Sequence, residues 1–120
     1  MVKIVTVYPG ADGESRLLDV TTEQFAEIVK HIGEGPTRLN QSPSPKVDDY
    51  HNASRVQYVV HLAGISEIEV ADGTIKRLRA GDVLVAQDTT GHGHITRGIG
   101  DEARVSLAIP LEQGDWIPKG

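Results

Sequence analysis

The chain has 120 residues, the size of one domain, and this length is enough for a hydrophobic core without disulfides or metals as staples. Its 12 basic and 17 acidic residues give a net charge of −5, which disfavours a nucleic-acid partner because phosphates attract basic surfaces. Cysteine is absent, so any metal must use imidazole, carboxylate or amide ligands. No apolar run reaches the length of a membrane-spanning helix, and no basic segment leads into one, so a cytoplasmic protein with no membrane partner is expected.

The first elements expected are two strands. Residues 2–8 are rich in β-branched side chains and end at Pro9-Gly10, which predicts a strand followed by a turn. Residues 16–20 fit a second short strand.

A single helix is expected next. Thr21 and Gln24 have the spacing of a capping box, and Gly33 is a stop signal. Between them, apolar residues recur at the spacing of one helix face, namely Phe25, Ile28, Val29 and Ile32. Residues 33–49 contain three prolines and two glycines, which predict a loop or an irregular crossing strand.

From Tyr50 onward the pattern is that of short strands separated by turns. Asp72-Gly73 is a hairpin signal, because glycine accepts the positive φ of a tight turn. The strands expected are 56–62, 65–70, 74–78, 83–86, 94–97 and 104–109. Their even spacing predicts an all-β sandwich or closed barrel, with the helix as an N-terminal accessory.

The histidines are the candidates for chemistry, because imidazole is both a common metal ligand and an acid–base group near neutral pH. His92 and His94 lie two residues apart, so they share a face if the chain there is extended. The glycines on either side of His92 could break this alternation and turn one of the pair to solvent. If residues 51–61 are extended, His51, Gln57 and His61 also share a face.

Two spaced patterns carry a resemblance to the cupin superfamily. Gly81 and His92 have the spacing of that family's second motif, although its Pro, second Gly and Asn are replaced here by Gln87, Thr89 and Thr96. In the first motif, Gly64 matches the family's glycine. That match puts three residues at the positions of the family's Glu, first His and second His, namely Gln57, His51 and Ala53.

The chain is more closely similar to a group of small bacterial and fungal cupins. That group has a His-x-Ala-Pro-Arg-x-Gln segment and a Gly-Asp-Val-Leu-Leu-x-x-Asp-Thr-Thr-Gly-x-Gly-His segment. Residues 51–57 match the first, with Ser54 in place of Pro. The residues that correspond to the second are Gly81-Asp82, Asp88-Thr89-Thr90-Gly91 and Gly93-His94. The likeness covers roughly residues 48–111.

The resemblance implies an all-β, double-stranded β-helix barrel of the jelly-roll kind with both histidine-bearing faces inward. Residues 1–120 would form a single cupin domain, in which 1–49 are an N-terminal extension and 50–111 the barrel core. The resemblance also implies a homodimer. The N-terminal strand is expected to offer an unpaired edge that a symmetric partner can cover.

The leading functional hypothesis is a small enzyme that binds a divalent transition metal. Its ligands would be drawn from His51, Gln57, His61, His92 and His94. Imidazole suits Fe, Ni, Zn, Mn and Cu alike. The substrate would be a small oxygen-rich or carboxylate-bearing metabolite, and the reaction an oxygenation, an isomerisation or a lyase step. A neutral Gln57 in place of Glu would leave the full charge of the ion to polarise bound water or an enolate.

The catalytic roles expected fall on four residues. His51 and His94 would serve as ligands or acid–base groups, Arg55 would bind a substrate carboxylate, and Asp88 would either orient His94 or cap its own turn. Two alternatives stay open. In one, no metal is used, and His51 or His94 acts as a general acid–base while Gln57 and Arg55 hold the substrate. In the other, the protein captures a small molecule without converting it.

Overall fold

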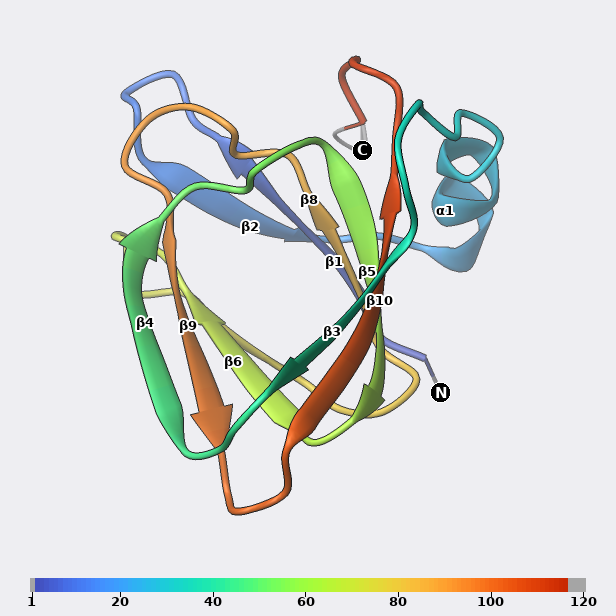
Figure 1. Cartoon of the computed structure of the whole chain (residues 1–120). Helices are drawn as coiled ribbons and strands as arrows, with labels where there is room; N and C mark the ends of the chain where they lie inside the picture. Colours follow the sequence, from blue (N-terminus) through green and yellow to red (C-terminus); the bar gives the residue numbers. More distant parts are fainter. Residues whose placement is uncertain (1, 117–120) are drawn as a thin grey trace.

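The computed structural model describes residues 2–116 and consists mainly of strands, with one short helix (Figure 1). The larger sheet has six strands in the order β2 (Ser15–Asp19), β1 (Ile4–Pro9), β8 (Val83–Ala86), β5 (Gln57–Ala63), β10 (Arg104–Pro110) and β3 (Arg38–Ser42). The smaller sheet has four in the order β4 (Lys46–His51), β9 (His94–Ile99), β6 (Ile65–Glu69) and β7 (Ile75–Leu78). The expected β-rich architecture is confirmed, and from β5 onward each strand lies within two residues of its predicted bounds.

Strand β1 lies inside the larger sheet and not at its edge. It pairs antiparallel with β2 and parallel with β8, where Ile4 lies opposite Val83. The expectation of an unpaired edge on the N-terminal strand is therefore wrong, because both sides of β1 are hydrogen-bonded. A homodimer stays a prediction without that support. Residues 2–49 are also more than an extension, since they supply β1, β2, β3 and most of β4.

The helix α1 (Thr22–Ile28) has the predicted capping box but is shorter than predicted. The Thr21 side chain accepts a hydrogen bond from the Gln24 amide at 3.1 Å, and the Gln24 side chain accepts one from the Thr21 amide at 2.8 Å. The expected continuation to Ile32 is wrong. Ile32 forms a β-bridge with Leu111 instead, so backbone pairing with the C-terminal segment takes the place of another helical turn.

The segment 33–49, expected to be a loop or an irregular crossing strand, contains two strands. β3 pairs with β10 in the larger sheet, and β4 pairs with β9 in the smaller one. Each is an edge strand of its sheet. Leu39 is 57 % exposed and Val47 64 % exposed, so neither strand shows the alternation of apolar and polar residues that half-buried strands have.

Two hydrophobic clusters flank the larger sheet. β8 contributes to both, because consecutive side chains of a strand point to opposite faces. The outer cluster packs against α1, and its buried residues are Ile4, Val20, Ile28, Val56, Val83, Val85 and Leu111. The inner cluster joins the larger sheet to the smaller one, and its buried residues are Val5, Val7, Ile68, Val70, Leu78, Leu84 and Ala86.

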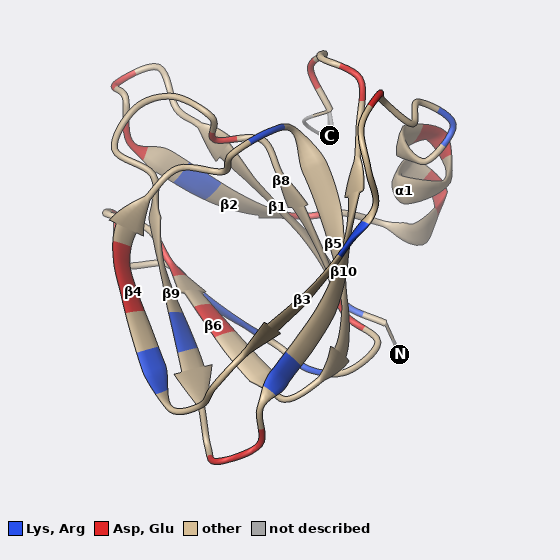
Figure 2. Ribbon diagram, viewed as in Figure 1, with Lys and Arg blue, Asp and Glu red and all other residues tan. Residues whose placement is uncertain are grey.

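Charged residues of both signs are interspersed over the two sheets and the connecting loops, with acidic residues along α1 (Figure 2). Within residues 2–116, the structure contains no helix with the length and hydropathy needed to span a bilayer.

Candidate functional site

Two adjoining cavities lie between the sheets, beside the inner cluster. The first, here called the histidine cavity, has a volume of about 350 Å³ and is lined by His51, Asn52, Ala53, Ser54, Gln57, Val59, Leu84, Ala86 and His94. The second, here called the polar cavity, has a volume of about 240 Å³ and is lined by Asn40, Ser42, His51, Val59, His61, Ser66, Ile68, Leu84, Thr96, Arg104 and Ser106. The two share His51, Val59 and Leu84, so they are neighbouring parts of one space between the sheets. This space opens to solvent at His51, Asn52 and Ser54, which are exposed.

His94 is the most firmly held residue of the site. It begins β9, is 5 % exposed, and its Nδ1 lies 2.6 Å from Oδ2 of Asp88. The hydroxyl of Ser15 donates to the same carboxylate oxygen at 2.8 Å. Because Nδ1 donates to the carboxylate, Nε2 is the ring nitrogen left to meet a molecule in the histidine cavity. Asp88 therefore orients His94, which is one of the two roles expected for it.

The carboxylate of Asp88 is fully buried, and its position is set from several sides. The backbone carbonyl of Asp88 accepts hydrogen bonds from the Ala53 amide at 3.1 Å and from the Asn52 side chain at 3.2 Å. Its second carboxylate oxygen, Oδ1, is buried without a hydrogen-bond partner among residues 2–116. Both donors to the side chain thus converge on a single oxygen, which fixes the carboxylate relative to the imidazole of His94.

His51 and His94 meet because of strand pairing. His51 ends β4 directly opposite His94 on β9, and the two ring centroids lie 4.6 Å apart at an interplanar angle of 57°. The Nδ1 of His51 donates to the carbonyl of Asp49 at 2.8 Å, which leaves its Nε2 available as well. The site therefore presents two neighbouring imidazoles, each with its Nδ1 engaged by the protein.

The loop before β9 separates His92 from His94. Gly91 and Gly93 have φ values of 81° and 85°, a backbone conformation that breaks the extended alternation. His92 is consequently exposed, stacks on Tyr50 at a centroid distance of 3.7 Å, and places its Nδ1 2.9 Å from a carboxylate oxygen of Glu14. A Cβ at position 93 would overlap the carbonyl of His51, so the close approach of the two histidine-bearing segments requires glycine there.

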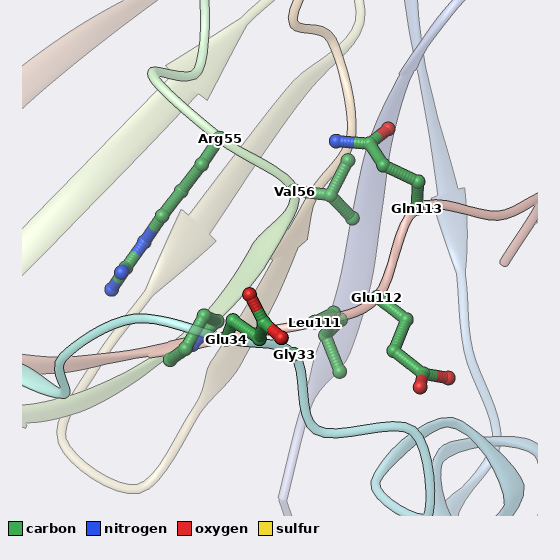
Figure 3. Close-up of a pocket in the computed structure, with 8 residues that line it drawn as sticks. Gly33, Glu34, Arg55, Val56, Leu111, Glu112 and Gln113 are labelled. Carbon is green, nitrogen blue, oxygen red and sulfur yellow. The ribbon is translucent and has the colours of Figure 1, made fainter.

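Arg55 is hydrogen-bonded to Gln57, whereas the sequence predicted that it binds a substrate carboxylate. The Nε of Arg55 donates to Oε1 of Gln57 at 2.8 Å, and its Nη2 donates to the carbonyl of Ala108 at 3.3 Å. Arg55 lines a separate pocket with Glu34 and Leu111 (Figure 3) and does not line the histidine cavity. Burial, and secondarily the charge of Arg38, lowers the pKa of Arg55. Arg55 therefore positions Gln57 and does not lie beside His51.

His61 lies in the polar cavity. It is 7 % exposed, and its Nδ1 donates to the carbonyl of Asp82 at 3.0 Å. Burial holds the pKa of His61 below its ordinary value, the charge of Arg104 also lowers it, and the contacts with Asp82 oppose that shift. The imidazole is thus kept neutral at physiological pH.

The predicted metal ligands do not all converge. His51, Gln57 and His94 surround one cavity, His61 lies in the next, and His92 contacts Glu14 and Tyr50 instead. The amide oxygen of Gln57 already accepts from Arg55. Within the described residues, no group of three or more His, Cys, Asp or Glu side chains could hold a metal ion. The five-residue ligand set therefore does not fit a metal held wholly by these side chains, and a metal on fewer protein ligands stays a prediction.

Sequence reasoning missed the residues that make the polar cavity polar. Ser66, Thr96, Arg104 and Ser106 all line it. Arg104 and Ser106 lie two residues apart on β10, and the register places Ser106 opposite His61. A polar residue at alternate positions of an otherwise apolar strand was the available signal.

Comparison with known proteins does not identify the chain: it matches no protein-family model, and a search of curated proteins finds no significant match.

Proposed function

We propose that this protein is a small enzyme with a cupin-type, double-stranded β-helix fold that converts a small metabolite by acid–base chemistry in the space between its sheets. The motif likeness of residues 51–57 and 81–94 supports the fold assignment, together with two facing sheets. The observation that carries the function is the Asp88–His94 pair at the wall of a cavity.

The pair has the parts of a general acid–base. The carboxylate of Asp88 holds the Nδ1 proton of His94, which selects the tautomer with a lone pair on Nε2. That nitrogen takes a proton from a bound molecule and returns it at another position or to a leaving group. Asp88 stabilises the imidazolium that forms in between. His51, with its ring next to that of His94, is placed to serve as the second acid–base group.

The lining of the histidine cavity indicates the kind of molecule that it accepts. Val59, Leu84 and Ala86 make an apolar wall, while Asn52 and Ser54 add an amide and a hydroxyl. The Nε2 of Gln57 remains a donor because its oxygen is taken by Arg55. These groups suit a small molecule with a short carbon skeleton and one or two carbonyl or hydroxyl oxygens.

The test is a search for turnover with matched variants. Wild-type protein is incubated with a panel of small hydroxy, keto and unsaturated carboxylic acids in D₂O, and conversion or deuterium incorporation is followed by proton NMR. His94→Gln should slow any conversion about 10²–10⁴-fold. Asp88→Asn, which removes the charge that orients and stabilises the imidazolium of His94, should slow it by up to about 10⁴-fold. His92→Gln is the control, because that exposed residue lies on the same loop, and its activity should equal wild type.

Two results would contradict the acid–base proposal. If His94→Gln converts the compound at the wild-type rate, His94 is not the acid–base group. If wild-type protein binds compounds of the panel and neither converts them nor exchanges their protons, the protein is a binding module.

A metal-dependent enzyme is the second candidate, favoured by the fact that both His51 and His94 have Nδ1 engaged and Nε2 available. Metal-ligating histidines typically show this arrangement. His51 and His94 would hold the ion, which would supply a Lewis acid for bound water or a substrate oxygen. Elemental analysis of untagged protein purified without chelator distinguishes the candidates. Close to one equivalent of metal in wild type, lost in both His51→Ala and His94→Ala, would favour the metal enzyme. Turnover that survives chelation would favour acid–base chemistry.

A further inference from the structure

Arg104 is a buried cation in the polar cavity whose hydrogen-bonding groups are left unused. Its side chain is 11 % exposed, and its Nε and Nη2, both closed off from solvent, make no hydrogen bond with any group of residues 2–116. The carboxylate of Asp48 is 3.9 Å from Nη2, which is too far for a hydrogen bond, and it also lies 3.4 Å from Lys46. Buried guanidinium groups are normally paired, and these two N–H groups would pair with an acceptor in the cavity once a small movement of the side chain turns them toward it.

The fold makes space for this guanidinium. Arg104 begins β10 opposite Ser42 on β3, and across the cavity the facing position on β9 is Gly98. A Cβ at Gly98 would lie only 2.8 Å from Nε of Arg104, and one at Gly64 would lie 3.0 Å from its Cγ. Two glycines, each on a strand or turn beside the arginine, therefore admit a side chain that larger residues would displace.

The other walls of the polar cavity carry groups that can donate to an anion. Four hydroxyls and one amide line it together with the guanidinium, from Ser42, Ser66, Thr96, Ser106 and Asn40. The cavity volume of about 240 Å³ equals that of roughly eight water molecules in the liquid, which is room for a short organic acid or a phosphate.

From these contacts we infer that the polar cavity is a binding site for a small oxyanion, a carboxylate or phosphate group, recognised by Arg104 and surrounding hydroxyls. A guanidinium presents paired N–H groups that match two oxygens of one anionic group. Hydroxyls from three further strands, β3, β6 and β9, complete the set of donors around it. Burial lowers the pKa of His61, which disfavours a second positive charge beside Arg104.

The oxyanion site adjoins the histidine cavity through His51, Val59 and Leu84. A metabolite anchored by its anionic group at Arg104 would extend past His51 toward His94. This link between the two cavities rests on the proposed function, whereas oxyanion binding at Arg104 does not.

The test uses potassium acetate, succinate and phosphate as probes, with potassium chloride at matched ionic strength as the blank. In wild type, about 10 mM of the preferred probe should raise the melting temperature by about 4 °C. Arg104→Gln should abolish this rise and weaken the Kd, measured by calorimetry, at least about tenfold, and Arg104→Lys should retain part of the affinity. Arg77→Gln is the matched control, because Arg77 is 44 % exposed and pairs with Glu67 outside the cavity. It should behave as wild type.

Comparison of the Kd for acetate and succinate with the Kd for phosphate decides which oxyanion the site binds. The inference is overturned if no probe raises the melting temperature of wild type more than it raises that of Arg104→Gln. If circular dichroism shows that Arg104→Gln does not fold, Ser66→Ala and Ser106→Ala replace it, and each should weaken the Kd several-fold; unchanged affinity in both would overturn the site. His94→Gln should bind the probe with wild-type affinity. That result, with no turnover in any protein, would leave the oxyanion site standing and the proposed enzyme refuted.

Discussion

The two halves of the space between the sheets are built in opposite ways. On the side of β1, β6, β7 and β8, it is filled by the aliphatic side chains of the inner cluster, several of them fully buried. On the side of β3, β4, β5, β9 and β10, it is hollow and is lined by imidazoles, hydroxyls and one guanidinium. Both halves belong to the same two sheets, so strand pairing alone does not explain the difference.

The difference separates residues that stabilise the fold from residues that are free to act. Aliphatic burial in the inner cluster supplies roughly 1.5–3 kcal/mol for each fully buried side chain. In the hollow half, a buried donor without a partner costs about 1–3 kcal/mol, and Arg104 has two such groups. The filled half therefore offsets an unfavourable term in the hollow half, and substitutions in the two halves should have contrasting effects.

The largest effect is expected in the filled half. Leu78→Ala removes a side chain with 0 % exposure and leaves a cavity, so it should lower the free energy of unfolding by about 3 kcal/mol in urea titrations. Ile75→Ala on the same strand is the control, because Ile75 is 49 % exposed, and its loss should stay below about 1 kcal/mol. Equal losses in the two variants would show that the inner cluster does not dominate stability.

The next effect concerns the boundary of the histidine cavity. Gly93→Ala combines a positive φ of 85° with overlap of the new Cβ and the carbonyl of His51, so it should destabilise the fold by about 2 kcal/mol. Gly73→Ala has a φ of 90° but nothing within 4 Å of the added Cβ, and it should lose only about 1 kcal/mol. The thermal unfolding difference between these variants measures the contact alone. A larger loss for Gly73→Ala would contradict the close packing described for Gly93.

A pH effect is expected from the hollow half. Burial lowers the pKa of His61 from its ordinary value of 6.5, so below that pH the unfolded chain binds a proton more readily than the folded protein does. Stability from this group is fully present above pH 6.5 and is lost as the pH falls, by at most about 1.4 kcal/mol per pH unit. Denaturant titrations between pH 7.5 and 5 should show a smaller decline for His61→Gln, with His31→Gln, an exposed histidine, as the control. Parallel declines in wild type and His61→Gln would contradict the burial argument.

The smallest effect is expected for a hydroxyl that lines the cavity. Ser106→Ala should change the free energy of unfolding by less than about 0.5 kcal/mol, because that hydroxyl faces open space in the hollow half. Ser15→Ala removes a hydroxyl with 1 % exposure that donates to Asp88, and it should lose about 1 kcal/mol. Thermal melts of the two alanine variants measure this difference. A lower stability for Ser106→Ala than for Ser15→Ala would contradict the assignment of the Ser106 hydroxyl to open space.

The strands from β5 to β10 could be predicted closely because each has buried apolar positions, and glycine-containing turns separate most of them. Gly73, for example, has the positive φ that the Asp72-Gly73 hairpin signal predicted. The edge strands β3 and β4 could not be predicted, since exposed side chains such as Leu39 and Val47 impose no apolar period. Their place is decided by pairing with β10 and β9, which are far away in the sequence.

The same division holds for the candidate site. The contact between Asp88 and His94 spans six residues within one segment, so local spacing was enough to suggest it. The separation of His92 from His94 followed from the flanking glycines. The position of Arg104 depends instead on the register of β10 against β3 and β5 and on the space left by Gly98, which no local pattern reveals.

The parallel pairing of β1 with β8 bears on how the chain reaches this state. Thr6 and Val85 are hydrogen-bonded although 79 residues separate them, so β1 finds its parallel neighbour β8 only after the intervening chain has been made. Such remote closure slows refolding to milliseconds or longer, which stopped-flow fluorescence of Trp116 can time. Until β8 pairs with β1, the side chains of Ile4, Val5 and Val7, buried in the folded protein, stay exposed, and exposed apolar surface of this kind favours aggregation.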